Sequence, residues 1–136
     1  MTRHFDWLAP WYERAISPPD AAPLVERLAL PAAGWLLDAG GGTGRASTLL
    51  RPYVDRVVVS DLSWPMLREA RRKGEVEAVR ASVLGLPHAS NRFARILVLD
   101  AFHHFPAQER ALAELLRVRR PDGRLVIQEP DITHPL

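Results

Sequence analysis

Short apolar runs alternate along most of the chain with segments in which apolar residues recur every three or four positions. The runs predict strands at residues 35–39, 56–60, 77–81, 95–99 and 124–129. The helical spacing predicts helices over 21–30, after Gly44, after Ser63 and over 107–118. Because a helix must carry the chain back between parallel strands, the pattern predicts an α/β fold with a doubly wound parallel sheet and helices on both faces.

The same spacing predicts which side of each helix faces the core. The expected inner residues are, in chain order, Leu24, Val25 and Leu28; Ala46, Leu49, Leu50 and Tyr53; Met66, Leu67 and Ala70; and Ala111, Leu112, Leu115 and Leu116. Ser63 is the expected N-cap of its helix, with Pro65 in the first turn. A turn is expected at 120–123, before the last strand.

Length and composition indicate one globular domain over 1–136, with an N-terminal helical segment at 1–30 and the core at 31–136. The sequence contains neither the roughly 20-residue apolar run of a membrane span nor a signal peptide, so a cytoplasmic protein is expected. The absence of cysteine excludes disulfides and thiolate metal ligands.

The net charge of +2 is small for a protein that binds nucleic acid. Basic residues cluster at 68–73 and 117–120, but acidic residues are interleaved with them. Solvated helix faces are therefore expected there, and neither a nucleic-acid surface nor a membrane surface. No pair of histidines has metal-ligand spacing, so no metal site is expected.

The segment from Asp38 to Gly44 leaves the first strand and opens the first helix. Its glycines permit a tight turn and let backbone N–H groups approach a ligand closely. The spacing is acidic-x-G-x-G-x-G. It does not fit the dinucleotide pattern GxGxxG, because Arg45 or Ser47 would occupy the third glycine position.

Asp61 ends the second strand, about 20 residues beyond the first glycine. A carboxylate at that place can accept hydrogen bonds from both hydroxyls of a ribose. The glycine turn and Asp61 together predict a nucleoside site at the carboxyl ends of the strands.

These motifs resemble those of the class I S-adenosylmethionine-dependent methyltransferases of the small-molecule, ubiquinone/menaquinone-biosynthesis type. Further similarity lies in Leu86-Pro87 followed by Phe93, in the loop 99–105 and in the segment 116–127. The resemblance implies a Rossmann-like sheet of order 3-2-1-4-5, S-adenosylmethionine as cofactor, and methyl transfer to a small-molecule acceptor. The residues it leads us to expect at the cofactor are Asp38, Gly40, Gly42, Gly44, Asp61, Leu62, Met66, Ser82, Val83 and Leu99.

The chain departs from this family pattern at several positions. Ser82 stands where the family has an acid that contacts adenine, Ala94 replaces an aspartate, and Pro121-Asp122-Gly123 replaces Pro-Gly-Gly. The family's last two strands are missing, which leaves the fifth strand as an open edge. Either a second copy pairs with that edge, the terminal residues fold over it, or the domain is an incomplete gene product; we favour a homodimer.

No catalytic residue is fixed by the resemblance, because the cofactor's own sulfonium activates the methyl group. His103 and His104 follow the fourth strand, where a histidine acts either as a general base or as a hydrogen-bonded structural residue. Asp100 either approaches the cofactor or caps the following turn. Four aromatic residues form either a lid over the methyl group or part of the core: Phe5, Trp7, Trp11 and Tyr12.

Three functions remain open from the sequence. The first is a small-molecule methyltransferase. The second is a module that binds S-adenosylmethionine or S-adenosylhomocysteine without turnover, suggested by Ser82, Ala94 and the missing elements. The third is a nicotinamide-dependent oxidoreductase, which the glycine spacing disfavours.

Overall fold

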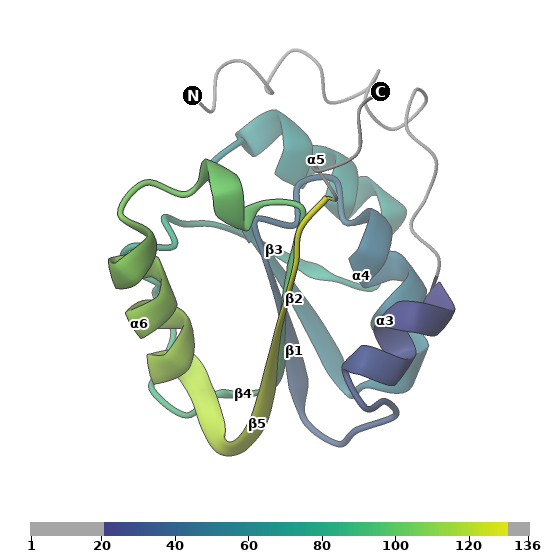
Figure 1. Ribbon diagram of the computed structural model, residues 1–136. Helices are drawn as coiled ribbons and strands as arrows, with labels where there is room; N and C mark the ends of the chain where they lie inside the picture. The colour runs from purple at the N-terminus through teal and green to yellow at the C-terminus, as the bar shows by residue number, and fades with distance from the viewer. Residues whose placement is uncertain (1–20, 131–136) are drawn as a thin grey trace.

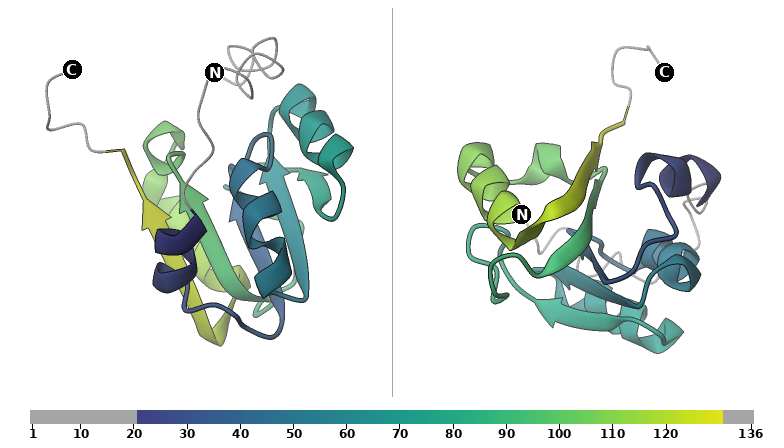
Figure 2. Two further views of the ribbon diagram at one scale, coloured as in Figure 1. Left: turned by 90° about the vertical axis from the view of Figure 1, so that its right-hand side faces the viewer. Right: turned by 90° about the horizontal axis from the view of Figure 1, so that it is seen from below.

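The strands of the molecule form a five-stranded parallel sheet in the order β3-β2-β1-β4-β5 (Figure 1). The computed structural model describes residues 21–130. The strands are β1 (Trp35–Ala39), β2 (Arg56–Asp61), β3 (Glu77–Arg80), β4 (Phe93–Leu99) and β5 (Arg119–Gln128). Figure 2 shows β3 and β5 at opposite margins of the sheet. The predicted doubly wound sheet and its strand order are confirmed.

Helices cover both faces of the sheet, as predicted. They are α3 (Ala21–Arg27), α4 (Arg45–Leu50), α5 (Trp64–Lys73) and α6 (Gln108–Val118), with 3-10 turns η1 (Arg51–Tyr53) and η2 (Phe102–His104). Figure 1 shows α6 on one side of the sheet and α3 and α4 on the other. Among residues 21–130, no helix is long and apolar enough to cross a membrane.

The core has two layers because side chains alternate across each strand. On one face Leu36, Val57 and Leu97 pack with residues of α3, α4 and α5. On the other face Leu37, Val58, Ile96 and Val98 pack with Ala111, Leu115 and Val118 of α6. The central strands are buried on both faces, which explains why they read as continuous apolar runs.

The prediction of inner helix residues holds for α3 and α5 and fails in part elsewhere. The Ser63 hydroxyl accepts the backbone N–H of Met66 (3.3 Å), which confirms the cap. Tyr53 is 37% exposed, so its assignment to the core is wrong. The reason is that α4 ends at Leu50 and the chain then tightens into η1, which contains Pro52 and turns Tyr53 off the buried face.

The inner face of α6 also differs from the prediction. Leu112 and Leu116 are 36% and 43% exposed, whereas Ala111, Leu115 and Val118 are buried. The predicted and the observed buried residues both recur with a helical period. The observed buried face of α6 is rotated about the helix axis by roughly one residue from the predicted face. Contact with β4 and β5 sets that rotation.

The region around the start of β5 differs from the predicted turn and short strand. Residues 120–123 lie within β5 as an irregularity, because Phe93 pairs with Arg119 while Arg95 pairs with Arg124. A Cβ at Gly123 would lie 2.9 Å from the carbonyl oxygen of Phe93, so glycine lets the bulged strand approach β4. β4 accordingly begins at Phe93, two residues earlier than predicted.

Candidate functional site

A cavity of about 870 Å³ lies at the carboxyl ends of β1, β2 and β4. This volume is within the roughly 300–1,000 Å³ typical of small-molecule sites. The sequence-predicted residues on its wall are Asp38, Gly40, Gly42, Asp61, Leu62, Met66, Ser82, Val83 and Leu99. The fold therefore brings together residues from four separate segments at the edge where ligands of doubly wound sheets bind. Their contact with a cofactor stays a prediction.

Gly44 is the member of the predicted set that does not line the cavity. It is the N-cap of α4, in a left-handed conformation with φ 73°. A Cβ there would lie 3.1 Å from the Cβ of Ala70, so Gly44 allows α4 to pack closely against α5. Its place in the structure is that of a packing residue.

The glycine turn is fixed to the neighbouring strand through its backbone. The N–H groups of Gly40 and Gly41 both donate to the carbonyl oxygen of Ser60, at 2.8 and 3.2 Å. A Cβ at Gly41 would lie 2.5 Å from the carboxyl carbon of Asp38, closer than any real contact. Gly41 was not among the predicted site residues, although its place in the glycine run was a visible signal.

Asp38 lies beneath this turn and is only 1% exposed. Its carboxylate accepts a hydrogen bond from the Ser47 hydroxyl at 2.6 Å. Burial raises the pKa of Asp38 from its ordinary value of 3.8 to about 6; the Ser47 hydrogen bond opposes this rise, and the charge of Asp61 adds to it. A buried carboxylate at the cavity wall suits a cationic group in the cavity.

Asp61, the last residue of β2, is held by two backbone N–H groups. One carboxylate oxygen accepts from Gly42 (3.0 Å) and the other from Ser63 (2.9 Å). These bonds come from the glycine turn and from the cap of α5, so they fix the carboxylate between the two elements. The carboxylate also lines the cavity, where ligand hydroxyls can donate to it.

The side of the cavity beyond Asp61 is mostly apolar. Leu62 is 42% exposed, while Met66 and Val83 line the wall with little of their surface exposed. The Ser82 hydroxyl accepts the backbone N–H of Leu84 (3.1 Å), and its own proton can still donate. This part of the cavity therefore offers the planar ring of a nucleobase an apolar surface and one neutral polar group.

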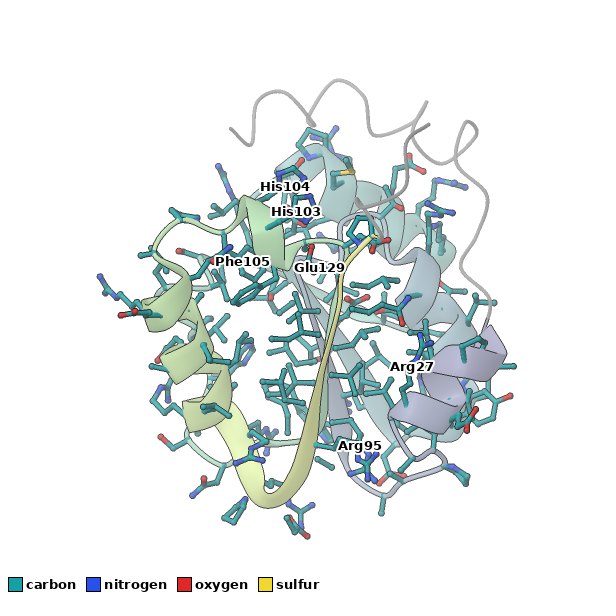
Figure 3. The ribbon with its side chains drawn as sticks, in the orientation of Figure 1. Arg27, Arg95, His103, His104, Phe105 and Glu129 are labelled. Atoms are coloured by element: carbon teal, nitrogen blue, oxygen red, sulfur yellow. The ribbon has the colours of Figure 1, made fainter. Side chains whose placement is uncertain are left out.

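The opposite side of the cavity is formed by the segment after β4, whose wall residues include Asp100, His103, His104 and Phe105. Figure 3 shows His103 and Glu129 together at this end of the sheet, with Arg95 at the other end. The Nδ1 atom of His103 contacts a carboxylate oxygen of Glu129. Sequence reasoning missed Glu129, although the ends of β4 and β5 were expected to be neighbours.

Asp100 adopts a left-handed conformation with φ 54° and donates its backbone N–H to the carbonyl of Gln128 (2.7 Å). Burial and the charge of Glu129 raise the pKa of its carboxyl group, while His103 and Arg45 lower it. The residue therefore links the ends of β4 and β5 and also presents a carboxyl group to the cavity.

The cavity fits the cofactor that the motifs predict. It combines a buried carboxylate, a fixed carboxylate at the end of β2, and an apolar surface, which match the cationic, ribose and base portions of S-adenosylmethionine. Between residues 21 and 130, no group of three or more His, Asp or Glu side chains could hold a metal ion. The aromatic residues proposed as a lid, Phe5 to Tyr12, lie outside the residues that the structure describes.

Comparisons with known proteins agree with the motifs and with the cavity. The family model of the methyltransferase domain matches residues 37–127. A demethylmenaquinone methyltransferase of Thermus thermophilus is 38% identical over 101 residues, covering 69% of this chain and 46% of that protein. A ubiquinone/menaquinone biosynthesis C-methyltransferase of Klebsiella pneumoniae is 34% identical over 104 residues, covering 69% and 41%.

A solved structure shows the same architecture. The putative methyltransferase of Bacillus halodurans matches with a TM-score of 0.75 and 30% identity, over 79% of this chain and 49% of that one. The chain thus spans less than half the length of the relatives named here. Because the family model matches more than half of the 136 residues, the chain belongs to the methyltransferase domain family.

Proposed function

We propose that the cavity binds S-adenosylmethionine and that the chain serves transfer of its methyl group to a small-molecule acceptor. The observation that carries the proposal is the Asp61 carboxylate, which two backbone N–H groups hold at the cavity wall. Family membership supports the same cofactor.

Each portion of the cofactor has a complementary group. Asp61 would accept the ribose hydroxyls, Leu62 and Val83 would flank the base, and Ser82 would donate to one of its nitrogen atoms. The turn at 40–42 and the carboxylate of Asp38 would hold the amino-acid portion. When bound, the cofactor supplies a methyl group already activated by its sulfonium. The residues of the chain then have to bind, orient and exclude water.

The first test is calorimetric titration of the chain with S-adenosylmethionine, S-adenosylhomocysteine and NAD. We expect both sulfur nucleosides to bind and NAD not to bind, in keeping with the glycine spacing. Binding of NAD without either sulfur nucleoside would overturn the proposal and support an oxidoreductase.

The Asp61→Ala variant tests the ribose contact. We expect its affinity for S-adenosylmethionine to fall by about 2–4 kcal/mol, because hydrogen bonds to a charged acceptor are lost. Asp122→Ala is the matched control, since Asp122 is an exposed aspartate near the start of β5, at the opposite end of the sheet. Equal affinity in Asp61→Ala and Asp122→Ala would remove Asp61 from the site.

A methyl-transfer screen separates an enzyme from a module that binds the cofactor without turnover. Quinol, phenol, amine and carboxylate acceptors are tested with labelled S-adenosylmethionine. The names of relatives for demethylmenaquinone and for ubiquinone/menaquinone biosynthesis are the reason to test quinols first. Tight cofactor binding without transfer to any class would favour the binding module.

Two finer points belong to the same proposal. β5 pairs with β4 on one side, and residues 21–130 place no strand on its other side, which supports a homodimer contact there. A monomer at all concentrations in light scattering would exclude that contact. A cytoplasmic location accords with these ligands, and fluorescent tagging in cells would test it.

A further inference from the structure

The segment after β4 places an imidazole at the cavity, and the end of β5 places a carboxylate beside it. Glu129 contacts His103 twice: one oxygen accepts the backbone N–H of His103 (3.2 Å), and the other contacts the ring Nδ1. The two residues are 26 positions apart, so the pair exists only because β4 and β5 are neighbours in the sheet.

Two contacts to one carboxylate fix both the backbone and the ring of His103. A carboxylate accepts hydrogen bonds and does not donate them, so Nδ1 must carry the proton in the neutral ring. The lone pair is then on Nε2, the nitrogen that can take up a proton. In other histidine bases a carboxylate in this position orients the ring.

His103 lies on the side of the cavity formed by the segment after β4. His103 lines the cavity together with His104 and Asp100, while Asp61 and the expected nucleoside site lie on the other side. The rings of His103 and His104 are 3.9 Å apart, and Asp100 interacts with the charge of His103. His103 is 45% exposed in its side chain, so an acceptor molecule can reach it.

We propose that His103 is the general base of methyl transfer, that Glu129 is its positioning residue, and that the acceptor carries a phenolic hydroxyl. This inference rests on the proposed function. As the methyl carbon leaves the sulfonium sulfur, the electron pair of that bond stays on sulfur. The acceptor oxygen forms the new bond to carbon, and its hydroxyl proton goes to Nε2 of His103. An alcohol or phenol needs such a base, whereas an acceptor that is already ionised does not.

The test uses two acceptors that share a skeleton and differ in acidity: 1-naphthol and 4-nitro-1-naphthol. In mildly alkaline buffer the first keeps its proton, since phenolic hydroxyls titrate near roughly pH 10, and the nitro compound is ionised. For His103→Ala we expect kcat with 1-naphthol to fall by about 10²–10⁴-fold. With 4-nitro-1-naphthol it should stay within about threefold, because no proton has to be removed.

Glu129→Gln separates positioning from catalysis. It keeps an acceptor near Nδ1 but removes the charge, so kcat with 1-naphthol should fall less than in His103→Ala, with KM nearly unchanged. Glu75→Gln is the control, because Glu75 is an exposed glutamate just before β3, at the amino end of the sheet. It should leave kcat with both acceptors unchanged. His104→Ala should have a smaller effect than His103→Ala.

A measurement without cofactor or acceptor tests the geometry directly. Nitrogen-15 spectra of the labelled chain report which ring nitrogen of each histidine carries the proton. We expect neutral His103 to be protonated on Nδ1, and Glu129→Ala to shift the population towards the Nε2-protonated form.

Four results would overturn the inference: equal losses on both naphthols in His103→Ala, the selective loss in His104→Ala instead, methylation of neither naphthol by the unaltered chain, or an Nε2-protonated His103. Titration with S-adenosylmethionine distinguishes this failure from that of the proposed function. If the cofactor binds while these tests fail, only the base and the acceptor class are wrong.

Discussion

Two carboxylates in the molecule lie in opposite electrostatic situations. Asp38, at the carboxyl edge of the sheet, has one hydrogen-bond donor from a side chain, and burial raises its pKa to about 6. Glu114, on α6, faces the guanidinium of Arg117 at 2.8 Å and also accepts the backbone N–H of Leu86. Its hydrogen bond to Arg117 lowers its pKa, against the opposing effect of burial.

The contrast between Asp38 and Glu114 distinguishes a carboxylate at a ligand site from one that holds the fold together. Arg117 also donates to the carbonyls of Leu86 and His88, so the Glu114–Arg117 pair ties α6 to the loop before β4 with its polar groups used internally. At the carboxyl edge, the carboxylates of Asp38 and Asp61 line the cavity, where groups of a ligand can contact them. A carboxylate at a cavity wall whose pKa is raised by burial marks the site.

The largest expected effect that tests this contrast is the pH dependence of stability from Asp38. Between pH 3.8 and about 6 the unfolded chain has lost the proton that folded Asp38 keeps, so the free energy of unfolding falls as the pH rises. The full penalty, on the order of 3 kcal/mol, applies above the folded pKa.

Asp38→Asn removes this titration. Urea unfolding of both proteins at several pH values should show the unaltered chain losing stability relative to Asp38→Asn across that window. A constant difference between the two proteins from pH 4 to pH 7 would mean that Asp38 is not buried as the structure has it.

Gly41→Ala is expected to have the next largest effect. Its Cβ would lie 2.5 Å from the carboxyl carbon of Asp38, which forces the turn to shift and costs about 2 kcal/mol of the free energy of unfolding. Affinity for S-adenosylmethionine should fall as well. Gly85→Ala is the matched control: nothing lies within 4 Å of a Cβ there, so stability should change by less than about 0.5 kcal/mol.

Glu114→Gln tests the scaffold carboxylate and has the opposite sign with pH. Because the folded pKa lies below the ordinary 4.5, the ionised form stabilises the fold above that value, and this contribution is lost as the pH falls through the folded pKa. At pH 7 the variant should lose about 1 kcal/mol of stability in urea unfolding.

At low pH Glu114→Gln and the unaltered chain should become equally stable. Glu75→Gln again serves as the control, with no effect at either pH. Cofactor affinity should be unchanged in Glu114→Gln, and a marked loss of affinity would remove the distinction between the two regions.

The smallest effect is expected at the amino edge of the sheet. The guanidinium of Arg92 lies 3.6 Å from the ring centre of Trp35, and that of Arg56 lies 4.6 Å from it. Arg92→Ala should lose roughly 0.5 kcal/mol of stability in thermal or urea unfolding, as expected for an exposed cation–π pair. Calorimetric affinity for S-adenosylmethionine should not change, and Arg92→Lys should restore part of the stability.

The sequence by itself determined the fold class, the strand order implied by the resemblance, and nine of the residues that line the cavity. Strand β1 begins and ends where its apolar run does, Asp61 ends β2, and Ser63 caps α5. These features depend on side-chain period and on short-range hydrogen bonding, which are properties of neighbouring residues and can be read along one chain.

Only the tertiary structure decided the features that depend on contacts between distant segments. The rotation of α6 buried Val118 and exposed Leu112, because packing against the sheet selects among faces with similar periodicity. Gly44 packs against Ala70 away from the cavity wall. Glu129 reaches His103 because β4 and β5 end side by side. Distances between such residues are set by packing in three dimensions, and spacing along the chain does not contain them.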